Sequence, residues 1–376
     1  MYTVTMYPLG NADCCRIDLA GGRKILFDYA NTRDANDPED KRVDLEQELR
    51  TDLRAAKRDF YDVVAFTHLD TDHFCGATEF FELRHAAKYQ GDGRIKIEEM
   101  WVPAGAICED RSDLAEEGRV IQAEARYRLK KGEGIRVFSR PRALEAWLRA
   151  QGLSLESRAH LITDAGQLVP GFSLSGQGVE FFVHSPFASR QDDGSLADRN
   201  SCSLVMQAVF EVLGRQTKLI LAADTTHDAW TEIVRITKFH NRQERLEWDV
   251  FKLPHHCSYL SLGPDKGKEK TEPVEAVRWL LEEQDQPGAI LVSTSDPIPA
   301  EDTDQPPHRQ AAKYYRENPH GGTFVVTMEH PKVSAPEPLV ITIDHRKATI
   351  RKRAVAASVT VTSVAAPRAG AHGHHS

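Results

Sequence analysis

Four side chains of the kind that bind metal ions lie close together in this chain. His68, Asp70, Asp72 and His73 directly follow the apolar residues 63–66. That apolar run is short and mostly β-branched or aromatic, as in a buried strand, so the four side chains are expected in a loop at the edge of a sheet. Imidazoles and carboxylates together suit divalent cations. The cluster therefore predicts a metal site; the alternative is an N-capped helix start whose acids are solvated.

Two later segments have the same form, a strand followed by a ligand. Residues 219–223 are apolar and lead to Asp224, and residues 250–254 lead to His255 and His256. A carboxylate can bridge two cations because each of its oxygens can bind one. With one histidine of the adjacent pair, these residues and the first cluster make six ligands, three for each of two metals, and Asp224 is expected to bridge them.

The elements that must position these residues alternate between strands and helices. In the first half we predict strands at 2–8, 14–19, 24–27, 63–66 and 95–102, a surface helix within 32–60, and a helix beginning near residue 77. In the second half we predict strands at 179–184, 203–212, 218–222, 250–253, 289–293 and 323–328, and helices at 229–239, 273–283 and 308–318. This order is typical of a layered α/β protein, with two sheets flanked by helices.

Two segments are expected to lie outside that sandwich. Residues 109–160 are polar with a helical pattern (115–131, then 141–151), and we expect a helical insertion or cap instead of part of the core sheet. Residues 1–350 would then form one domain. Residues 354–376 are rich in Ala, Val, Thr, Gly and His, and a disordered tail is predicted there.

Composition narrows the class of protein. The chain has 376 residues, of which 40% are hydrophobic and 28% charged, as in ordinary globular proteins. No apolar stretch approaches the roughly 20 residues that span a bilayer, the N-terminus lacks the pattern of a secretory signal, and the six cysteines show no disulfide spacing. We therefore expect a cytoplasmic protein with no membrane association. A net charge of −8 argues against a general nucleic-acid coat but leaves room for a nuclease, because bound metals bring their own positive charge.

The order of these motifs resembles the metallo-β-lactamase superfamily, whose hallmark is His-x-His-x-Asp-His after a core strand. Here Asp70 stands in place of the second histidine, as in the branch of ComEC-type DNA-uptake proteins and phosphorylcholine esterases. In the first half of the chain, further matches are a loose Gly-x-Gly-Asp turn ending at Asp13 and a strand ending at Asp28. In the second half, the Asn-x-x-Ser-Leu stretch begins at Asn200, a strand that ends in Gly-Asp in the family is matched at 223–224, and His-His-Gly-Ser is matched at 255–258. A later histidine that opens a helix is matched by His308. The resemblance covers about residues 1–345, is weak across 85–175, and implies an αββα sandwich.

The chain also departs from the family pattern. Cys75 and Cys257 stand where glycines are expected; they are either small residues tolerated in tight turns or thiols that act beside the metals. The third-motif histidine of the superfamily is also missing. His184 is its nearest candidate, and a structural histidine at a strand end is the alternative that we favour.

The resemblance and the chemistry of the residues together suggest roles. We assign His68, Asp70 and Asp224 to one metal, and Asp72, His73, His256 and Asp224 to the other; the metals would be Zn²⁺ or Mn²⁺. A hydroxide bridging them would attack the substrate, with Asp72 acting on that water and His255 at the phosphate as electrostatic partner or general acid. Whether His255 or His256 is the ligand stays open. Substrate contacts are expected from Lys252, Asn200 and His308, with a salt bridge as the alternative for Lys252 and a structural role as that for Asn200.

Three functions are compatible with this pattern. The leading hypothesis is a dinuclear phosphodiesterase or nuclease that acts on nucleic acid or nucleotides. The second is a hydrolase of a small phosphoester, lactone or thioester, and Asp70 counts against the last two because that chemistry accompanies the all-histidine motif. The third is a non-catalytic module that binds a protein partner, which the sequence does not identify, through residues 109–160.

Overall fold

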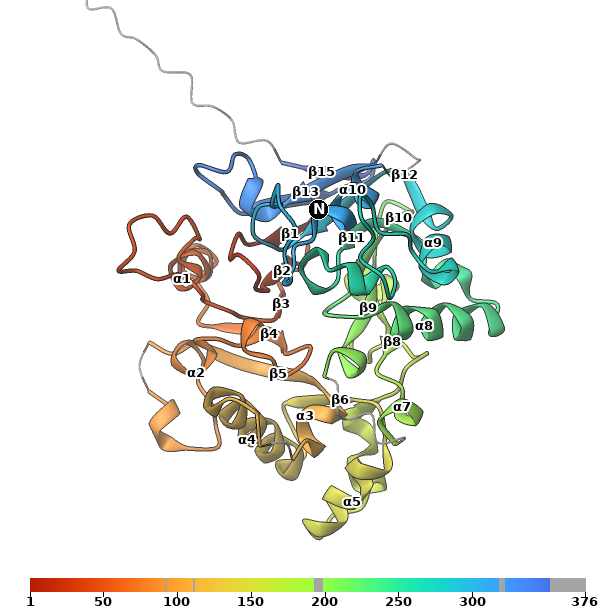
Figure 1. Cartoon of the computed structure of the whole chain (residues 1–376). Helices are drawn as coiled ribbons and strands as arrows, with labels where there is room; N and C mark the ends of the chain where they lie inside the picture. Colours follow the sequence, from red (N-terminus) through yellow and green to blue (C-terminus); the bar gives the residue numbers. More distant parts are fainter. Residues whose placement is uncertain (92, 111, 193–198, 318–321, 352–376) are drawn as a thin grey trace, which may run out of the picture.

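Two β-sheets pack against each other, and helices cover their outer faces (Figure 1). The computed structural model describes residues 1–351 except 92, 111, 193–198 and 318–321. The nine-stranded sheet has the order β15-β14-β1-β2-β3-β4-β5-β6-β7, with β1 (Tyr2–Met6), β2 (Cys15–Asp18), β3 (Lys24–Phe27), β4 (Phe60–Ala65), β5 (Lys96–Pro103), β6 (Ile135–Phe138), β7 (Ile162–Thr163), β14 (Leu339–Ile343) and β15 (Ala348–Ile350). The six-stranded sheet has the order β13-β12-β11-β10-β9-β8, with β8 (Val179–Ser185), β9 (Val205–Val212), β10 (Arg215–Leu221), β11 (Trp248–Lys252), β12 (Asp285–Ser293) and β13 (Thr323–Val326).

The helices form the two outer layers. On the nine-stranded sheet lie α1 (Leu45–Ala55), α2 (Ala77–Phe80), α3 (Ala104–Cys108), α4 (Glu116–Lys131) and α5 (Arg142–Ala150). On the six-stranded sheet lie α8 (His227–Phe239), α9 (Glu275–Glu282) and α10 (Arg309–Arg316), and the short helices α6 (Leu174–Gln177) and α7 (Ala188–Asp192) flank β8 along the chain. In α1, for example, the Asp44 side chain caps the first turn and Leu45, Leu49 and Leu53 face the sheet.

Both faces of the central strands are buried, which explains their unbroken apolar sequences. In β4, Val63 and Ala65 pack between the two sheets, whereas Tyr61 and Val64 pack under the helices. Strands β3 to β7 are parallel to one another, as are β10 to β13. Because the carboxyl ends of neighbouring parallel strands share one edge, the loops that follow them are brought together there.

The predicted fold class, an α/β protein with an αββα sandwich, is confirmed. The segment 109–160, however, is not entirely outside the core sheet, because β6 lies between β5 and β7. Its helices α4 and α5 pack on that sheet as part of the outer layer. Strands β6, β7, β14 and β15 were not predicted, and the expected tail at 354–376 falls outside the described residues. Among the helices that the structure describes, none has the length and apolarity needed to cross a membrane.

Candidate metal centre

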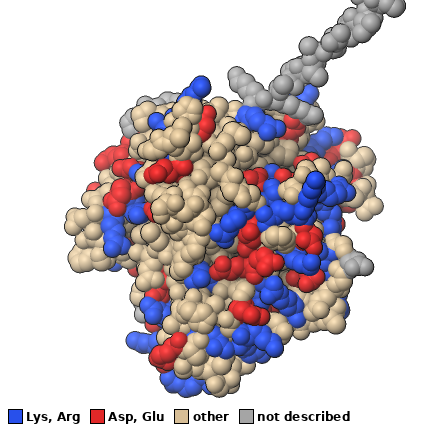
Figure 2. All heavy atoms as spheres, turned by 180° about the vertical axis from the view of Figure 1, so that it is seen from behind, with Lys and Arg blue, Asp and Glu red and all other residues tan. Residues whose placement is uncertain are grey.

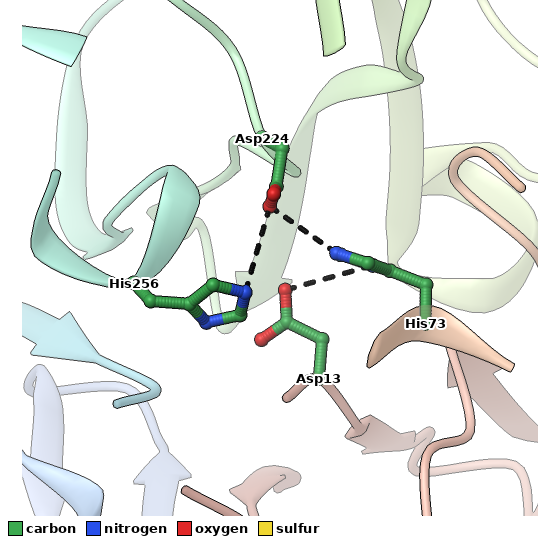
Figure 3. Close-up of side chains that lie close together, drawn as sticks. All are labelled: Asp13, His73, Asp224 and His256. Atoms are coloured by element: carbon green, nitrogen blue, oxygen red, sulfur yellow. Dashed lines mark ion pairs between the residues drawn. The ribbon is translucent and has the colours of Figure 1, made fainter. Parts of the chain in front are cut away.

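Loops from both sheets converge on a group of buried carboxylates and imidazoles. His73 ends the short helix η1 (Thr71–His73) after β4, Asp224 follows β10, His256 lies in η7 (His255–Cys257) after β11, and Asp13 lies in the turn between β1 and β2. All four are buried, and each offers one ligand atom within 4.8 Å of the others. Figure 3 shows the four side chains pointing toward one another. Such an arrangement of nitrogen and oxygen atoms can hold a divalent cation.

The carboxylate of Asp224 faces two separate sets of histidines. Its Oδ1 lies 3.2 Å from His73 Nε2 and 4.0 Å from His256 Nε2. Its Oδ2 lies 4.0 Å from His68 Nε2 and 3.9 Å from His255 Nε2. The two oxygens therefore point into two neighbouring spaces, each bordered by imidazole nitrogens.

The two aspartates of the first motif border different sides of this group. Asp72 Oδ2 lies 3.1 Å from His256 Nε2 and 3.9 Å from His73 Nε2, so it belongs to the Oδ1 side of Asp224. Asp70 Oδ2 lies 3.5 Å from His68 Nε2, on the Oδ2 side.

Hydrogen bonds outside the group fix which ring nitrogen of two histidines faces it. Nδ1 of His73 lies 2.9 Å from Asp28 Oδ2, and Asp28 also accepts hydrogen bonds from the backbone and hydroxyl of Thr67. Nδ1 of His256 donates to the carbonyl of Thr294 at 2.7 Å. Both rings therefore turn Nε2 inward, the orientation that outer hydrogen bonds impose on metal-binding histidines.

The charges within the group stabilise one another. For Asp224, burial raises the pKa, but His73 and His256 outweigh this and hold the pKa well below its usual value. For His256, burial lowers the pKa, yet Asp224 and Asp72 raise it to about 9. The pKa of His68 is lowered by burial and by His73, so its imidazole is favoured in the neutral form that binds metals.

The residues present fit a metal. Nε2 of His68, Nε2 of His73 and Oδ1 of Asp224 are buried and make no hydrogen bond. Buried polar atoms are nearly always satisfied, and a site for an ion is one of the explanations for an exception. Nitrogen and oxygen atoms that face each other across a few ångströms without hydrogen bonds are a donor set suited to a metal ion.

Asp70 also forms an ion pair with the side chain of Arg199. Arg199 Nη1 donates to Asp70 Oδ1 at 2.8 Å, and Arg199 also binds Glu109 Oε1 through Nε at 2.7 Å and Asp113 at 3.1 Å. Asp70 Oδ2 remains directed toward His68. A small pocket, open to solvent, adjoins this point and is lined by Arg199 and Glu109 together with His68, Leu69, Pro103, Gly105, Ala106 and Cys202.

The three predicted substrate-binding residues have structural contacts. Lys252 is buried, and its Nζ lies 2.6 Å from Asp13 Oδ2, so the salt-bridge alternative describes its position. His308 is also buried; its ring packs edge-on against Tyr259, and its Nδ1 accepts a hydrogen bond from the Tyr259 backbone. Asn200 begins the short helix η5 (Asn200–Cys202), where its carbonyl accepts the Ser203 hydroxyl.

The loops of the site carry backbone strain. Ala223 (φ +45°), His255 (+50°), His256 (+52°) and Cys257 (+66°) all adopt left-handed conformations. Each costs about 1–2 kcal/mol for a residue with a Cβ. The superfamily pattern has glycine at 223 and 257, and these φ angles are the physical reason. A hydrogen bond from His255 N to Ala223 O joins the two strained loops.

The cysteines beside the site are not activated thiols. Cys257 is buried and its burial raises the pKa of the thiol to about 12, while burial and Glu117 raise the pKa of the half-buried Cys75. Both thiols are therefore protonated near neutral pH, which favours the alternative of small residues in turns.

His184 has a structural position at the end of β8. Its Nε2 donates to the carbonyl of Arg245 at 2.8 Å, and burial lowers its pKa to about 4. The unfolded-state value is near 6.5, so the fold favours the neutral ring. Its contribution to stability is complete above pH 6.5 and is lost as the pH falls toward 4.

We expect this residue to make the protein sensitive to acid. The free energy of unfolding should fall by up to about 3 kcal/mol over that window because of His184, since one pKa unit corresponds to about 1.4 kcal/mol. Urea unfolding at pH 7, 6 and 5 measures the loss. In His184→Gln the protein should be less stable at pH 7, but its stability should depend less on pH. Parallel pH profiles for the two proteins would refute the assignment.

Several residues of the site gave little signal in the sequence. Asp13 and Asp28 stood out only as matches to family motifs, without a role. Thr67 and Thr294 act through single hydrogen bonds, and Arg199 lies far from Asp70 in the chain, so no spacing could reveal these contacts.

Comparisons with known proteins add little to this picture. No protein-family model and no curated protein matches the chain. Among solved structures, a diphosphatase of the PhnP family is similar over 92% of this chain and 98% of its own, with 10% identity and a TM-score of 0.36. Zn²⁺-bound PqqB from Methylobacterium extorquens is similar over 91% of this chain and 100% of its own, with 10% identity and a TM-score of 0.33. Similarities this weak assign neither a family nor an activity.

Proposed function

We propose that this protein is a phosphodiester hydrolase that depends on two divalent cations. The observation that carries the proposal is the position of Asp224, whose Oδ1 faces His73 and His256 and whose Oδ2 faces His68 and His255. A carboxylate with its oxygens directed into two ligand groups is suited to bridging two ions.

The ligands divide into two sets. His68, Asp70 and Asp224 would hold one cation, and Asp72, His73, His256 and Asp224 the other. When bound, two such cations lower the pKa of coordinated water and neutralise charge on phosphoryl oxygens. Three carboxylates among six ligands are compatible with Mn²⁺ as well as Zn²⁺.

The two adjacent histidines have different positions, which supports different roles. His256 is buried and both of its ring nitrogens are engaged, Nδ1 by Thr294 and Nε2 near Asp72. The side chain of His255 is 21% exposed and its Nε2 lies 3.9 Å from Asp224. We therefore assign His255 to hold a proton at Nε2 for the leaving oxygen of the substrate, and His256 to the ligand set.

The surroundings of His68 favour a small phosphodiester over a nucleic-acid polymer. Three carboxylates, those of Asp70, Glu109 and Asp113, surround the single guanidinium of Arg199 beside the pocket. On the face shown in Figure 2, Lys and Arg are interspersed with Asp and Glu. A long polyanion is bound best where basic side chains are not paired with acidic ones.

Metal analysis and a substrate panel test the proposal. We expect about two ions per chain, and hydrolysis of bis-p-nitrophenyl phosphate with Mn²⁺ or Zn²⁺ that is lost in Asp72→Ala. Single-stranded DNA, RNA and cyclic dinucleotides should be assayed beside it, and rapid cleavage of the polymers would restore the nuclease hypothesis. Unchanged turnover in Asp72→Ala would contradict the mechanism, and a protein that binds no metal would favour a partner-binding module.

A further inference from the structure

Asp13 is the residue of the cluster whose oxygens already have partners within the protein. Its Oδ2 lies 2.6 Å from Lys252 Nζ, and its Oδ1 accepts the hydroxyl of Thr294 at 2.5 Å. The pair is buried, and both partners are charged: despite burial, Lys252 keeps the pKa of Asp13 below its usual value and Asp13 raises that of Lys252. A carboxylate engaged in this way is a poor candidate for a metal ligand, although it lies within reach of the site.

The contacts of Asp13 join the two halves of the sandwich at the metal centre. Asp13 lies in the β1–β2 turn of the nine-stranded sheet, whereas Lys252 ends β11 and Thr294 follows β12 in the six-stranded sheet. The backbone N–H of Asp13 donates to the carbonyl of Asp72 at 2.9 Å. The carbonyl of Thr294 in turn accepts Nδ1 of His256.

Asp72 is therefore connected to Asp13 by one backbone hydrogen bond, and His256 is connected to it by two hydrogen bonds, both through Thr294. Asp72 belongs to the loop after β4, and His256 to the loop after β11, and these two ligands lie 3.1 Å apart across the interface between the sheets. A change in the distance between the sheets at this edge would separate them.

We propose that Asp13, paired with Lys252, is a positioning residue that sets the metal affinity of the centre by holding Asp72 and His256 in register. This inference rests on the proposed function only in requiring that the cluster binds metal. Outer-shell residues of metal sites typically change affinity by about 10–100-fold when they are replaced.

The double variant Asp13→Leu/Lys252→Met separates this role from simple stabilisation. Replacing a buried ion pair by apolar residues of similar size is often neutral for stability. We expect its melting temperature in EDTA to stay within a few degrees of the wild type. Its Kd for Zn²⁺, titrated calorimetrically into the metal-free protein, should rise about 10–100-fold without a change in stoichiometry.

Two further single variants serve as controls for the double variant. Asp13→Asn, a single-atom change, should raise the Kd at least about 10-fold at temperatures where it is folded, and it decides the question if the double variant does not fold. Arg128→Met breaks a buried ion pair of α4 with Glu124, and it should lower the melting temperature while leaving the Kd unchanged.

The outcomes distinguish this inference from the proposed function. An unchanged Kd in the double variant, or the loss of one ion per chain, would overturn the positioning role, the second because it would make Asp13 a ligand. A wild-type protein that binds no metal would overturn the proposed function and this inference with it.

Discussion

Replacing Asp224 by asparagine is expected to reduce the metal content from two ions per chain to one or none. The amide keeps the size of the side chain but loses its negative charge, and its nitrogen cannot bind a cation. Loss of an outer-shell residue alone costs about 10–100-fold in metal-dependent function, so loss of the bridging ligand should lower phosphodiester hydrolysis by more than about 100-fold. Metal analysis after dialysis, together with turnover of bis-p-nitrophenyl phosphate, measures both effects.

Asp228→Asn provides a matched control for that variant. Asp228 lies four residues further along the chain, in α8, and its side chain is 74% exposed. Within the described residues, its one ion-pair partner is the neighbouring His227. Metal content and turnover should match the wild type. If Asp224→Asn retained two ions, or if both variants lost activity equally, the bridging role of Asp224 would be wrong.

The sequence was sufficient to predict where the ligand-type side chains gather, because these residues follow strand ends. An apolar run followed at once by a ligand, as at Val64 to His68 or Leu221 to Asp224, identifies the strand and its edge together. Two such edges in a layered α/β protein are expected to meet, and the structure brings His73, Asp224 and His256 within reach of a single ion. The roles of the individual residues remain proposals, since they depend on a metal.

The contacts that orient these ligands could not be predicted, because they join residues that no local pattern relates. Thr294 fixes the ring of His256 through its backbone carbonyl, which every residue possesses, so its identity carries no signal. For Lys252, in contrast, the identity of the residue suggests the wrong environment. A lysine that ends a strand suggests a surface charge, and only the buried carboxylate of Asp13 explains why it lies inside.

Polarity misled the prediction for residues 109–160 in a similar way. Helix α4 has charged residues on several sides, which favoured a solvated cap, yet Glu124 and Arg128 are both buried against the sheet. Arg128 donates to Glu124 at 2.6 Å and to the carbonyls of Ile97 and Gly134 near the starts of β5 and β6. Glu124 also accepts the backbone N–H of His85. The Glu124–Arg128 pair thus holds α4 on the sheet through hydrogen bonds, where apolar side chains usually do so by packing.

Arg128→Met is therefore expected to be strongly destabilising. The substitution leaves the Glu124 carboxylate buried without its guanidinium and removes the donor to three backbone carbonyls. Breaking one partner of a buried ion pair costs about 3–5 kcal/mol, a large part of the 5–15 kcal/mol that stabilises a typical domain. Urea unfolding at neutral pH, in EDTA so that metal binding does not contribute, measures the change.

The same substitution at an exposed pair isolates the effect of burial. Arg149 pairs with Glu145 at 2.7 Å, also one helical turn apart, but on α5 its side chain is 77% exposed. Exposed pairs of this kind contribute about 0.3–0.5 kcal/mol, so Arg149→Met should change the free energy of unfolding by no more than that. If the two variants were equally stable, the contacts of Arg128 would not hold α4 on the sheet. The prediction of a loosely packed cap at residues 109–160 would then be favoured again.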